Sequence, residues 1–288
     1  MTTPIPPSEG VLPPGAQGPP GSGAPPELEI DFPLRQRRWT VLVRLFLLIP
    51  QMIVVAVLGV GAGVTGVIGW FAALVTGRLP EWAEGFLRGY LAWYTRLAAY
   101  ALLLTDQYPP FAFTAPDYPV RVAFAPAAPL NPVAVLFRLI LAIPAAFVVT
   151  FVLYGWELFG FFAWLTVLFV GRTPPALFHA TAAVVRYNLR YQTYLFMLTP
   201  GYPNRLFGDQ PGPAGAEPAR SHPDTTPHST ATPPTTAGTR PLYITGGAKV
   251  LLIVFIILGV LGFAGRIISN TVLTANHQLP TTSYTTDH

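Results

Sequence analysis

The longest apolar stretch of the chain runs from Thr40 to Thr76 and is interrupted only by Arg44 and Gln51. As one helix it would be about 55 Å long at 1.5 Å per residue, nearly twice the thickness of the hydrocarbon core of a bilayer. Pro50 offers a natural division, because proline removes a backbone donor and clashes with the preceding turn.

This division predicts two membrane elements. An amphipathic segment over residues 37–49 would lie in the interface, with Arg38 and Arg44 among the lipid headgroups, and a spanning helix would follow over residues 50–76. The alternative is a tight two-helix hairpin that turns at the glycine-rich residues 59–63.

The same landmarks occur twice along the chain, always 94 residues apart. A constant offset indicates a duplicated structural unit without insertions. We therefore expect residues 44–109 and 138–203 to have their helices in the same order and direction. The repeated landmarks are Arg44 and Arg138, Trp70 and Trp164, Gly77 and Gly171, Arg96 and Arg190, Tyr100 and Tyr194, and Tyr108 and Tyr202.

The second helix of each unit is less apolar than the first and carries the candidate charge sites. An arginine at the centre of a bilayer costs about 2.5–3.5 kcal/mol on insertion scales, so each should contact a carboxylate, carbonyls, a tyrosine hydroxyl or a lipid phosphate. The candidates are Arg88, Arg96 and Tyr100 in the first unit and Arg186, Arg190 and Tyr194 in the second.

Glu157 is the one carboxylate well inside an apolar run, and Gly63 is its counterpart in the first unit. A buried carboxylate must be neutralised or find a cation. The leading interpretation is a structural Glu–Arg pair with a second helix. An interfacial position at a hairpin turn and an ion- or proton-coupling site are the alternatives.

Short alternating segments precede each unit, over residues 28–32 and residues 118–124. Together with residues 111–114 they predict a small strand or hairpin at the membrane surface.

Composition divides the chain into six parts. They are a Pro/Gly-rich disordered tail (1–27), membrane repeat 1 (28–113), membrane repeat 2 (117–207), a Pro/Thr/Ala-rich linker (208–242), a C-terminal transmembrane helix (243–270) and a polar tail (271–288). The fold class expected is all-α: a multi-pass transmembrane protein with about five spans plus interfacial segments.

Charge sets the expected orientation. With two spans in each repeat, most arginines lie on the side of the N-terminus, and only Arg78, Arg172 and Arg266 lie on the other. The positive-inside rule therefore predicts a cytoplasmic N-terminus. The net charge of +4 is spread along the chain, which suits anionic membrane lipids as partners better than nucleic acid.

Candidate chemistry is sparse. Only 10% of the residues are charged, 51% are hydrophobic and none is cysteine, so thiol nucleophiles and thiolate metal sites are excluded. No spaced histidine pair or phosphate-binding glycine loop is visible. We expect neither an enzyme nor a bound cofactor.

The repeated motifs resemble a bacterial membrane family known as domain of unknown function 4389. The resemblance rests on the Ile-Pro stretch, the tryptophan before Gly-Arg-x-Pro, the inner Arg and Tyr, and the closing Leu-Thr-Asp-Gln-Tyr-Pro-Pro-Phe of residues 104–111. In the second unit Pro200 replaces Asp106, so any role of the acid would be confined to the first unit. The resemblance implies the bacterial cell membrane and no particular activity.

Two classes of function are therefore expected. One is a scaffold, or a module that binds lipid or a membrane protein partner through its arginine faces. The other is a small transporter or channel that uses intramembrane Arg and Glu, since transporters are often built from internal repeats.

Overall fold

The computed structural model describes residues 25–32, 36–208 and 244–277. The described part is mostly helical. Its elements, in chain order, are β1 (Glu27–Ile30), α1 (Arg38–Thr76), α2 (Glu81–Ala101), β2 (Val120–Ala123), α3 (Pro132–Leu136), α4 (Arg138–Val170), α5 (Pro175–Leu195) and α6 (Gly246–His277).

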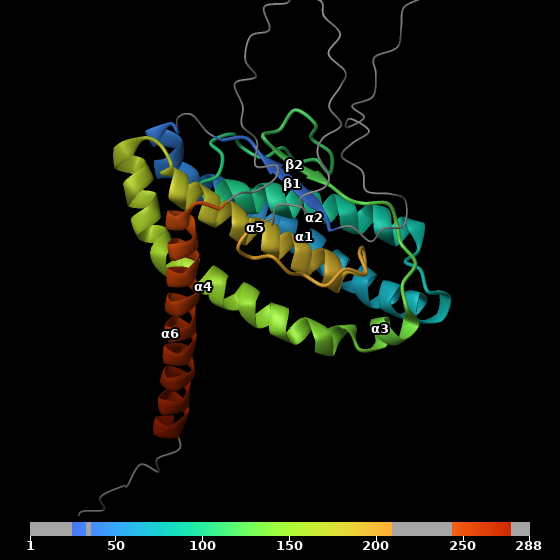
Figure 1. Ribbon diagram of the computed structural model, residues 1–288. Coiled ribbons are helices and arrows are strands. Elements are labelled where there is room, and N and C mark those ends of the chain that lie inside the picture. The colour runs from blue at the N-terminus through green and yellow to red at the C-terminus, as the bar shows by residue number, and fades with distance from the viewer. Residues whose placement is uncertain (1–24, 33–35, 209–243, 278–288) are drawn as a thin grey trace, which may run out of the picture.

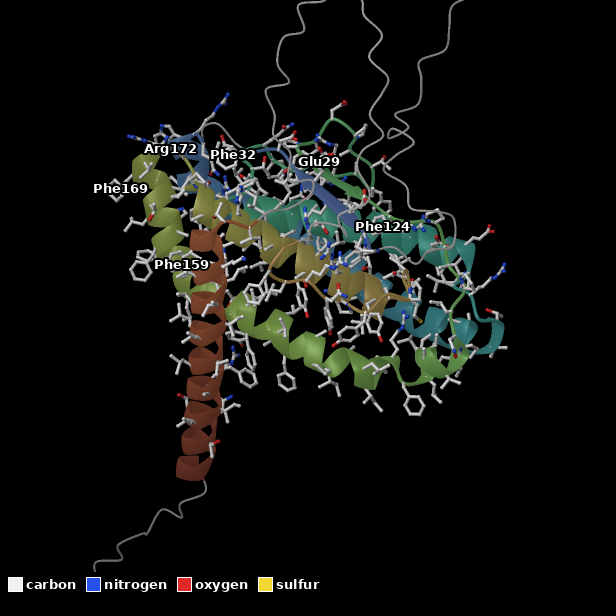
Figure 2. The ribbon with its side chains drawn as sticks, in the orientation of Figure 1. Glu29, Phe32, Phe124, Phe159, Phe169 and Arg172 are labelled. Carbon is white, nitrogen blue, oxygen red and sulfur yellow. The ribbon has the colours of Figure 1, made fainter. Side chains whose placement is uncertain are left out.

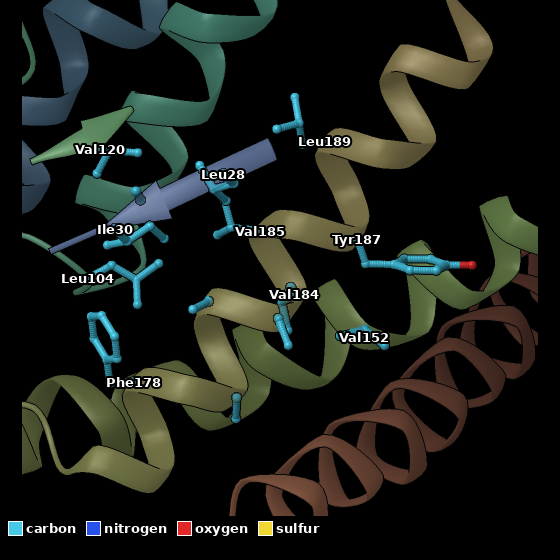
Figure 3. Packing of buried hydrophobic residues seen from close by; sticks show 14 of the residues in the cluster. Leu28, Ile30, Leu104, Val120, Val152, Phe178, Val184, Val185, Tyr187 and Leu189 are labelled. Atoms are coloured by element: carbon cyan, nitrogen blue, oxygen red, sulfur yellow. The ribbon is translucent and has the colours of Figure 1, made fainter. Parts of the chain in front are cut away.

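These elements form three layers (Figure 1). The antiparallel pair of β1 and β2 covers one face of α2 and α5, and α1 and α4 lie against these two helices from other sides. Figure 3 shows the core around α5, where Leu28 of β1 and Val152 of α4 approach the helix at Val184 and Val185.

A pseudo-twofold axis relates the two repeats. In the strand pair, Leu28 lies opposite Val122, which is its own equivalent 94 residues later. Between α2 and α5, the Asn188 amide donates to the Tyr94 hydroxyl at 3.5 Å, and these residues are also 94 apart. A residue that faces its own equivalent lies on the symmetry axis, so the axis passes through the strand pair and between α2 and α5.

Reciprocal tryptophan hydrogen bonds join the repeats away from the axis. The Trp70 indole donates to the Val135 carbonyl at 2.9 Å, and the Trp164 indole donates to the Val41 carbonyl at 2.8 Å. Each tryptophan lies near the end of one long helix and reaches the start of the other repeat. Helices α1 and α4 therefore run antiparallel and meet at both ends. The order of the helices is the same in both halves, but a twofold rotation relates them, so the expectation that the halves run in the same direction is wrong.

Glycines end both long helices, as their sequence motifs predict. Gly77 and Gly171 have φ values of 69° and 73°, in the left-handed region where glycine carries no Cβ penalty. Their carbonyls then accept backbone hydrogen bonds across the axis, from Leu130 at 2.8 Å and from Gln36 at 3.0 Å. The helix ends thus serve as contacts between the repeats.

Helix α1 is continuous through both Pro50 and residues 59–63, so the predicted division at Pro50 is wrong and the hairpin alternative is absent. Polar anchors on both sides of the proline explain this. Arg44 donates to the Tyr100 carbonyl and Gln51 donates to the Pro109 carbonyl at 2.6 Å. Both contacts hold α1 to the α2 side through the region where a proline would otherwise separate two helices.

Within the part of the chain that the structure describes, three helices are long and apolar enough to cross a membrane, namely α1, α4 and the part of α6 from Gly246 to Thr271. The five expected spans are therefore not confirmed. Helices α2 and α5 are less apolar because they carry arginines that bind carbonyls of the chain, and α5 in particular is buried along most of its length. Their apolar residues contact protein on several sides.

Helix α6 crosses α4 at direct backbone contact. A Cβ on Gly155 would lie 1.7 Å from the Phe255 carbonyl oxygen, and one on Gly259 would lie 1.8 Å from the Phe151 carbonyl oxygen. The two helices can approach this closely only because neither glycine has a side chain. Figure 1 shows that α4 changes direction at this crossing and that α6 projects beyond the rest of the protein.

We predict that Gly155→Ala and Gly259→Ala each destabilise the α4–α6 packing, because overpacking a tight contact costs about 1–3 kcal/mol. Thermal unfolding in detergent, followed by tryptophan fluorescence, would measure the loss. Gly63→Ala and Gly265→Ala are matched controls, since nothing lies within 4 Å of a Cβ at either position. Equal melting temperatures for all four variants would contradict the close crossing.

Candidate functional site

Two arginines are buried at equivalent places in the repeats. Arg44 and Arg138 are each 2% exposed, and each guanidinium lies 4.4 Å above the ring of Tyr100 or Tyr194. The same groups donate to the carbonyls of these tyrosines, at 2.7 Å in the case of Arg138. Cation–π stacking and carbonyl acceptors together compensate for lost hydration. The predicted position of Arg44 among lipid headgroups is therefore wrong.

The two tyrosines are held in turn by the closing Tyr-Pro motifs. The rings of Tyr100 and Tyr108 meet edge to face at 5.8 Å, and those of Tyr194 and Tyr202 meet at 5.5 Å. Each repeat thus ties the start of its first helix to the end of its second helix and to the segment that follows. This explains why the landmarks recur together.

Asp106 adds a carboxylate to the first repeat only. Its two oxygens accept hydrogen bonds from the Thr40 hydroxyl and from the Arg37 backbone N–H, the latter at 3.1 Å, and one oxygen lies 3.5 Å from the Arg44 guanidinium. Pro200 stands at the equivalent position, where Arg138 instead donates to the Thr199 carbonyl at 3.2 Å. The acid fixes the beginning of α1.

A polar cluster next to Asp106 also has no polar equivalent. The Gln36 amide donates to the Leu103 carbonyl at 2.7 Å and to the Thr173 hydroxyl at 2.8 Å, and it accepts from Arg44 at 3.3 Å. The symmetry-related side chains are Leu130, Leu79 and Met197, which belong to an apolar cluster. The fold is pseudo-symmetric, but the chemistry at its two ends differs.

Arg96 and Arg190 contact backbone carbonyls, one of the partner types expected from the sequence. Arg96 donates to the carbonyls of Ala112 and Phe113, the latter at 3.1 Å, and Arg190 donates to the Asn204 carbonyl at 3.4 Å. Burial lowers the pKa of Arg96 below its ordinary value, and the guanidinium still stays charged at neutral pH. These arginines hold the segments that follow α2 and α5 against the helices.

Arg88 and Arg186 have related roles. Arg88 donates to the Ala125 carbonyl at 2.7 Å and pairs with Glu84 on its own helix, while Arg186 donates to the Leu28 carbonyl of β1 at 2.8 Å. The candidate arginines of the second helices are thus partnered by the chain itself. The sequence located these residues, and the structure assigns them contacts within the fold.

Glu157 is exposed and has no ion-pair partner among the residues that the structure describes, so the leading expectation of a Glu–Arg pair is wrong. The arginines of α2 and α5 turn toward the strand pair and the connecting segments, away from Glu157. Near it, Arg266 of α6 donates to the Tyr154 hydroxyl at 2.8 Å.

A cluster of exposed arginines lies where the start of α1 meets the end of α4, and we call it the basic corner. It consists of Arg37, Arg38 and Arg172, and Arg38 donates to the Phe169 carbonyl at 3.1 Å. Figure 2 shows Arg172 and Phe169 together at this end of the molecule. The sequence contains each arginine but cannot show their proximity, which depends on the antiparallel packing of the repeats.

The comparisons place the chain in a family. The profile of the Domain of unknown function (DUF4389) matches residues 38–112 and 132–206, which together are more than half of the chain, so the chain belongs to this family and contains two tandem copies of its domain. No curated protein and no solved structure matches significantly. Helix α6 lies outside both matched regions.

We predict that Asp106→Asn lowers the stability of the first repeat by about 1.5–3 kcal/mol, the typical value of hydrogen bonds to a charged group. The variant retains the size of the side chain but weakens its contacts with Thr40, Arg37 and Arg44. Thermal unfolding in detergent would report the change. Asp117→Asn, at an exposed position, is the control and should melt like the parent protein.

Replacement of Arg96 or Arg190 by Lys should lower the melting temperature nearly as much as replacement by Leu. Lysine keeps the charge but loses the planar fork that reaches the carbonyls, while leucine leaves those acceptors without a donor. Arg78→Leu, at an exposed position, is the control. If both Leu variants express and melt like the parent protein, these arginines do not stabilise the fold.

Proposed function

We propose that the protein is a non-enzymatic membrane module, a scaffold that binds lipids or a membrane partner at its edges. The observation that carries this proposal is that the arginines bind the protein's own backbone while its large apolar side chains are exposed. Arginines that could have served a transport path instead hold backbone carbonyls, whereas large apolar side chains are exposed along α1, α4 and α6. An exposed apolar surface of this extent requires a bilayer or a partner.

The segment between the repeats supports a particular membrane position. Residues 102–131 contain no helix, and they extend from one end of α1 to the other end. Near one end, Asp106 accepts from the Arg37 N–H, and at the other end Leu130 donates to the Gly77 carbonyl. If α1 crossed the membrane, this segment would have to cross as well. Non-helical backbone is not tolerated in contact with lipid, and Asp117 of this segment is exposed.

We therefore place both ends of α1 and of α4 on the same side of the membrane. The 39 residues of α1 extend about 58 Å, which is too long for an upright span and suits a helix that lies in or dips into one leaflet. Figure 1 shows the bent α4, which reaches its crossing with α6 between its two ends.

Helix α6 is then the one span among the described helices. Lys249 and Arg266 flank its apolar part and are about 26 Å apart along the axis, close to the hydrocarbon thickness of a bilayer. The N-terminus is cytoplasmic in this proposal. Arg266 would be the only Lys or Arg of the sequence on the far side, so the charge asymmetry is greater than with five spans.

Cysteine accessibility distinguishes this arrangement from five spans. The chain has no native cysteine, so Glu81→Cys and Pro175→Cys, exposed and symmetry-equivalent, can be labelled singly. We expect both to be protected from an impermeant maleimide in intact cells and to react after permeabilisation. Asp117→Cys should behave in the same way, and Ser283→Cys should react in intact cells. External labelling at Glu81→Cys and Pro175→Cys would favour the five-span topology.

Proteoliposomes test the class of function. A scaffold should leave proton and potassium fluxes at the level of protein-free vesicles. A flux that depends on the protein and is lost in Glu157→Gln would overturn the scaffold proposal in favour of a transporter or channel.

A further inference from the structure

We infer that the basic corner binds the headgroup of an anionic phospholipid from the same leaflet that holds α1 and α4. This inference rests on the proposed membrane position and names a ligand and a site for the proposed module. The candidate arginines of α2 and α5 are not part of this site, because they contact the carbonyls of their own chain.

The contacts between the repeats build this site. The Gln36 backbone N–H donates to the Gly171 carbonyl at 3.0 Å, so the residues that follow each of them, Arg37 and Arg172, lie close to one another. Arg38 is fixed against the same turn, with one guanidinium nitrogen on the Phe169 carbonyl at 3.1 Å. The site therefore has a rigid base made of helix ends, and it is not a loose collection of surface charges.

The corner also carries charge that is free to bind. Arg37 and Arg172 are exposed, and no side-chain hydrogen bond or ion pair involves either guanidinium among the residues that the structure describes. Asp106 is the nearby carboxylate, and it is occupied by the start of α1 and by Arg44. The three corner arginines and the buried Arg44 make four guanidinium groups against one carboxylate, which leaves a net charge of +3. Planar guanidinium groups match the geometry of phosphate oxygens.

Large apolar side chains next to the corner point to a lipid as the source of the phosphate. Trp39 is 76% exposed and Phe169 is 70% exposed, and each lies within three residues of a corner arginine. Tryptophan and arginine side by side are typical of the headgroup level of a membrane, where an aromatic ring contacts acyl chains and a cation contacts phosphate. A soluble phosphate compound would make no use of these apolar groups.

The pseudo-twofold axis supplies an internal comparison. At the opposite end of the molecule, the residues equivalent to Arg37, Arg38 and Trp39 are Asn131, Pro132 and Val133, and Arg78 alone corresponds to a corner arginine. The same backbone contact is present there, since Leu130 donates to the Gly77 carbonyl. The protein therefore has a basic corner with three arginines and, on a similar backbone, an opposite corner with one.

The test uses the full chain in zwitterionic detergent micelles and measures binding of dioctanoyl phosphatidylglycerol by native mass spectrometry and by thermal shift. Dioctanoyl phosphatidylcholine and inorganic phosphate are parallel ligands. The variants are the double substitution Arg37→Gln with Arg172→Gln, which removes no side-chain contact that the structure records, and the control Arg78→Gln at the opposite corner.

We expect phosphatidylglycerol to bind the parent protein and the Arg78→Gln variant alike. The double variant should bind it about 25-fold more weakly, since each arginine near an anionic headgroup contributes roughly a fivefold factor, while its melting temperature without lipid stays unchanged. Equal binding by the double variant, equal binding of phosphatidylcholine, or competition by inorganic phosphate at the same concentration would each overturn the assignment. Flux or external labelling in the earlier experiments would instead contradict the scaffold or its topology and leave a measured lipid site in place.

Discussion

The fold depends on arginines that must find acceptors after they leave water. Arg44 and Arg138 each reach from the first helix of a repeat to the last carbonyls of the second helix, and each stacks on a tyrosine ring at the same place. A lone guanidinium among apolar side chains would be unfavourable, but carbonyls at a helix C-terminus lack partners within the helix and carry partial negative charge. One contact therefore satisfies both groups. Arg96 and Arg190 use backbone carbonyls in the same way, and they thereby hold the segments that follow α2 and α5 against these helices.

Duplication gave the protein two copies of this set of arginine–carbonyl contacts. We infer from the differences between the two repeats where function has been added. The long helices, their terminal glycines and the tryptophan bonds occur in both repeats. The carboxylate of Asp106, the amide of Gln36 and the three clustered arginines of the basic corner lie at the end of the molecule where α1 begins and have no counterpart as a group at the other end. We therefore regard the end of the molecule around Leu130 as a structural counterpart of the basic corner.

The sequence predicted what depends on local pattern and period. It identified the 94-residue duplication, the glycine helix ends, the short strands and the inner arginines as groups in need of acceptors. It did not predict that α1 would continue through Pro50, because that outcome depends on contacts made by Arg44 and Gln51 with residues that lie 56 and 58 positions away. Hydropathy suggested a membrane span for each second helix, since apolar residues that face protein and those that face lipid look alike in a sequence. The predicted Glu–Arg pair of Glu157 is wrong because the strand pair and the connecting segments determine where the arginine side chains point. The sequence alone does not show those directions.

The glycine crossing of α4 and α6 has a consequence for the order in which the protein is made. Helix α6 follows both repeats in the chain, yet its middle residues sit directly on the backbone of α4. On the topology that we propose, everything before residue 246 leaves the ribosome on the cytoplasmic side, and the repeats can settle on the membrane as a peripheral body. Emergence of α6 then adds the crossing helix. Because Gly155 lies against the Phe255 backbone and Gly259 against the Phe151 backbone, that last step would turn a reversible attachment into a permanent one at this crossing.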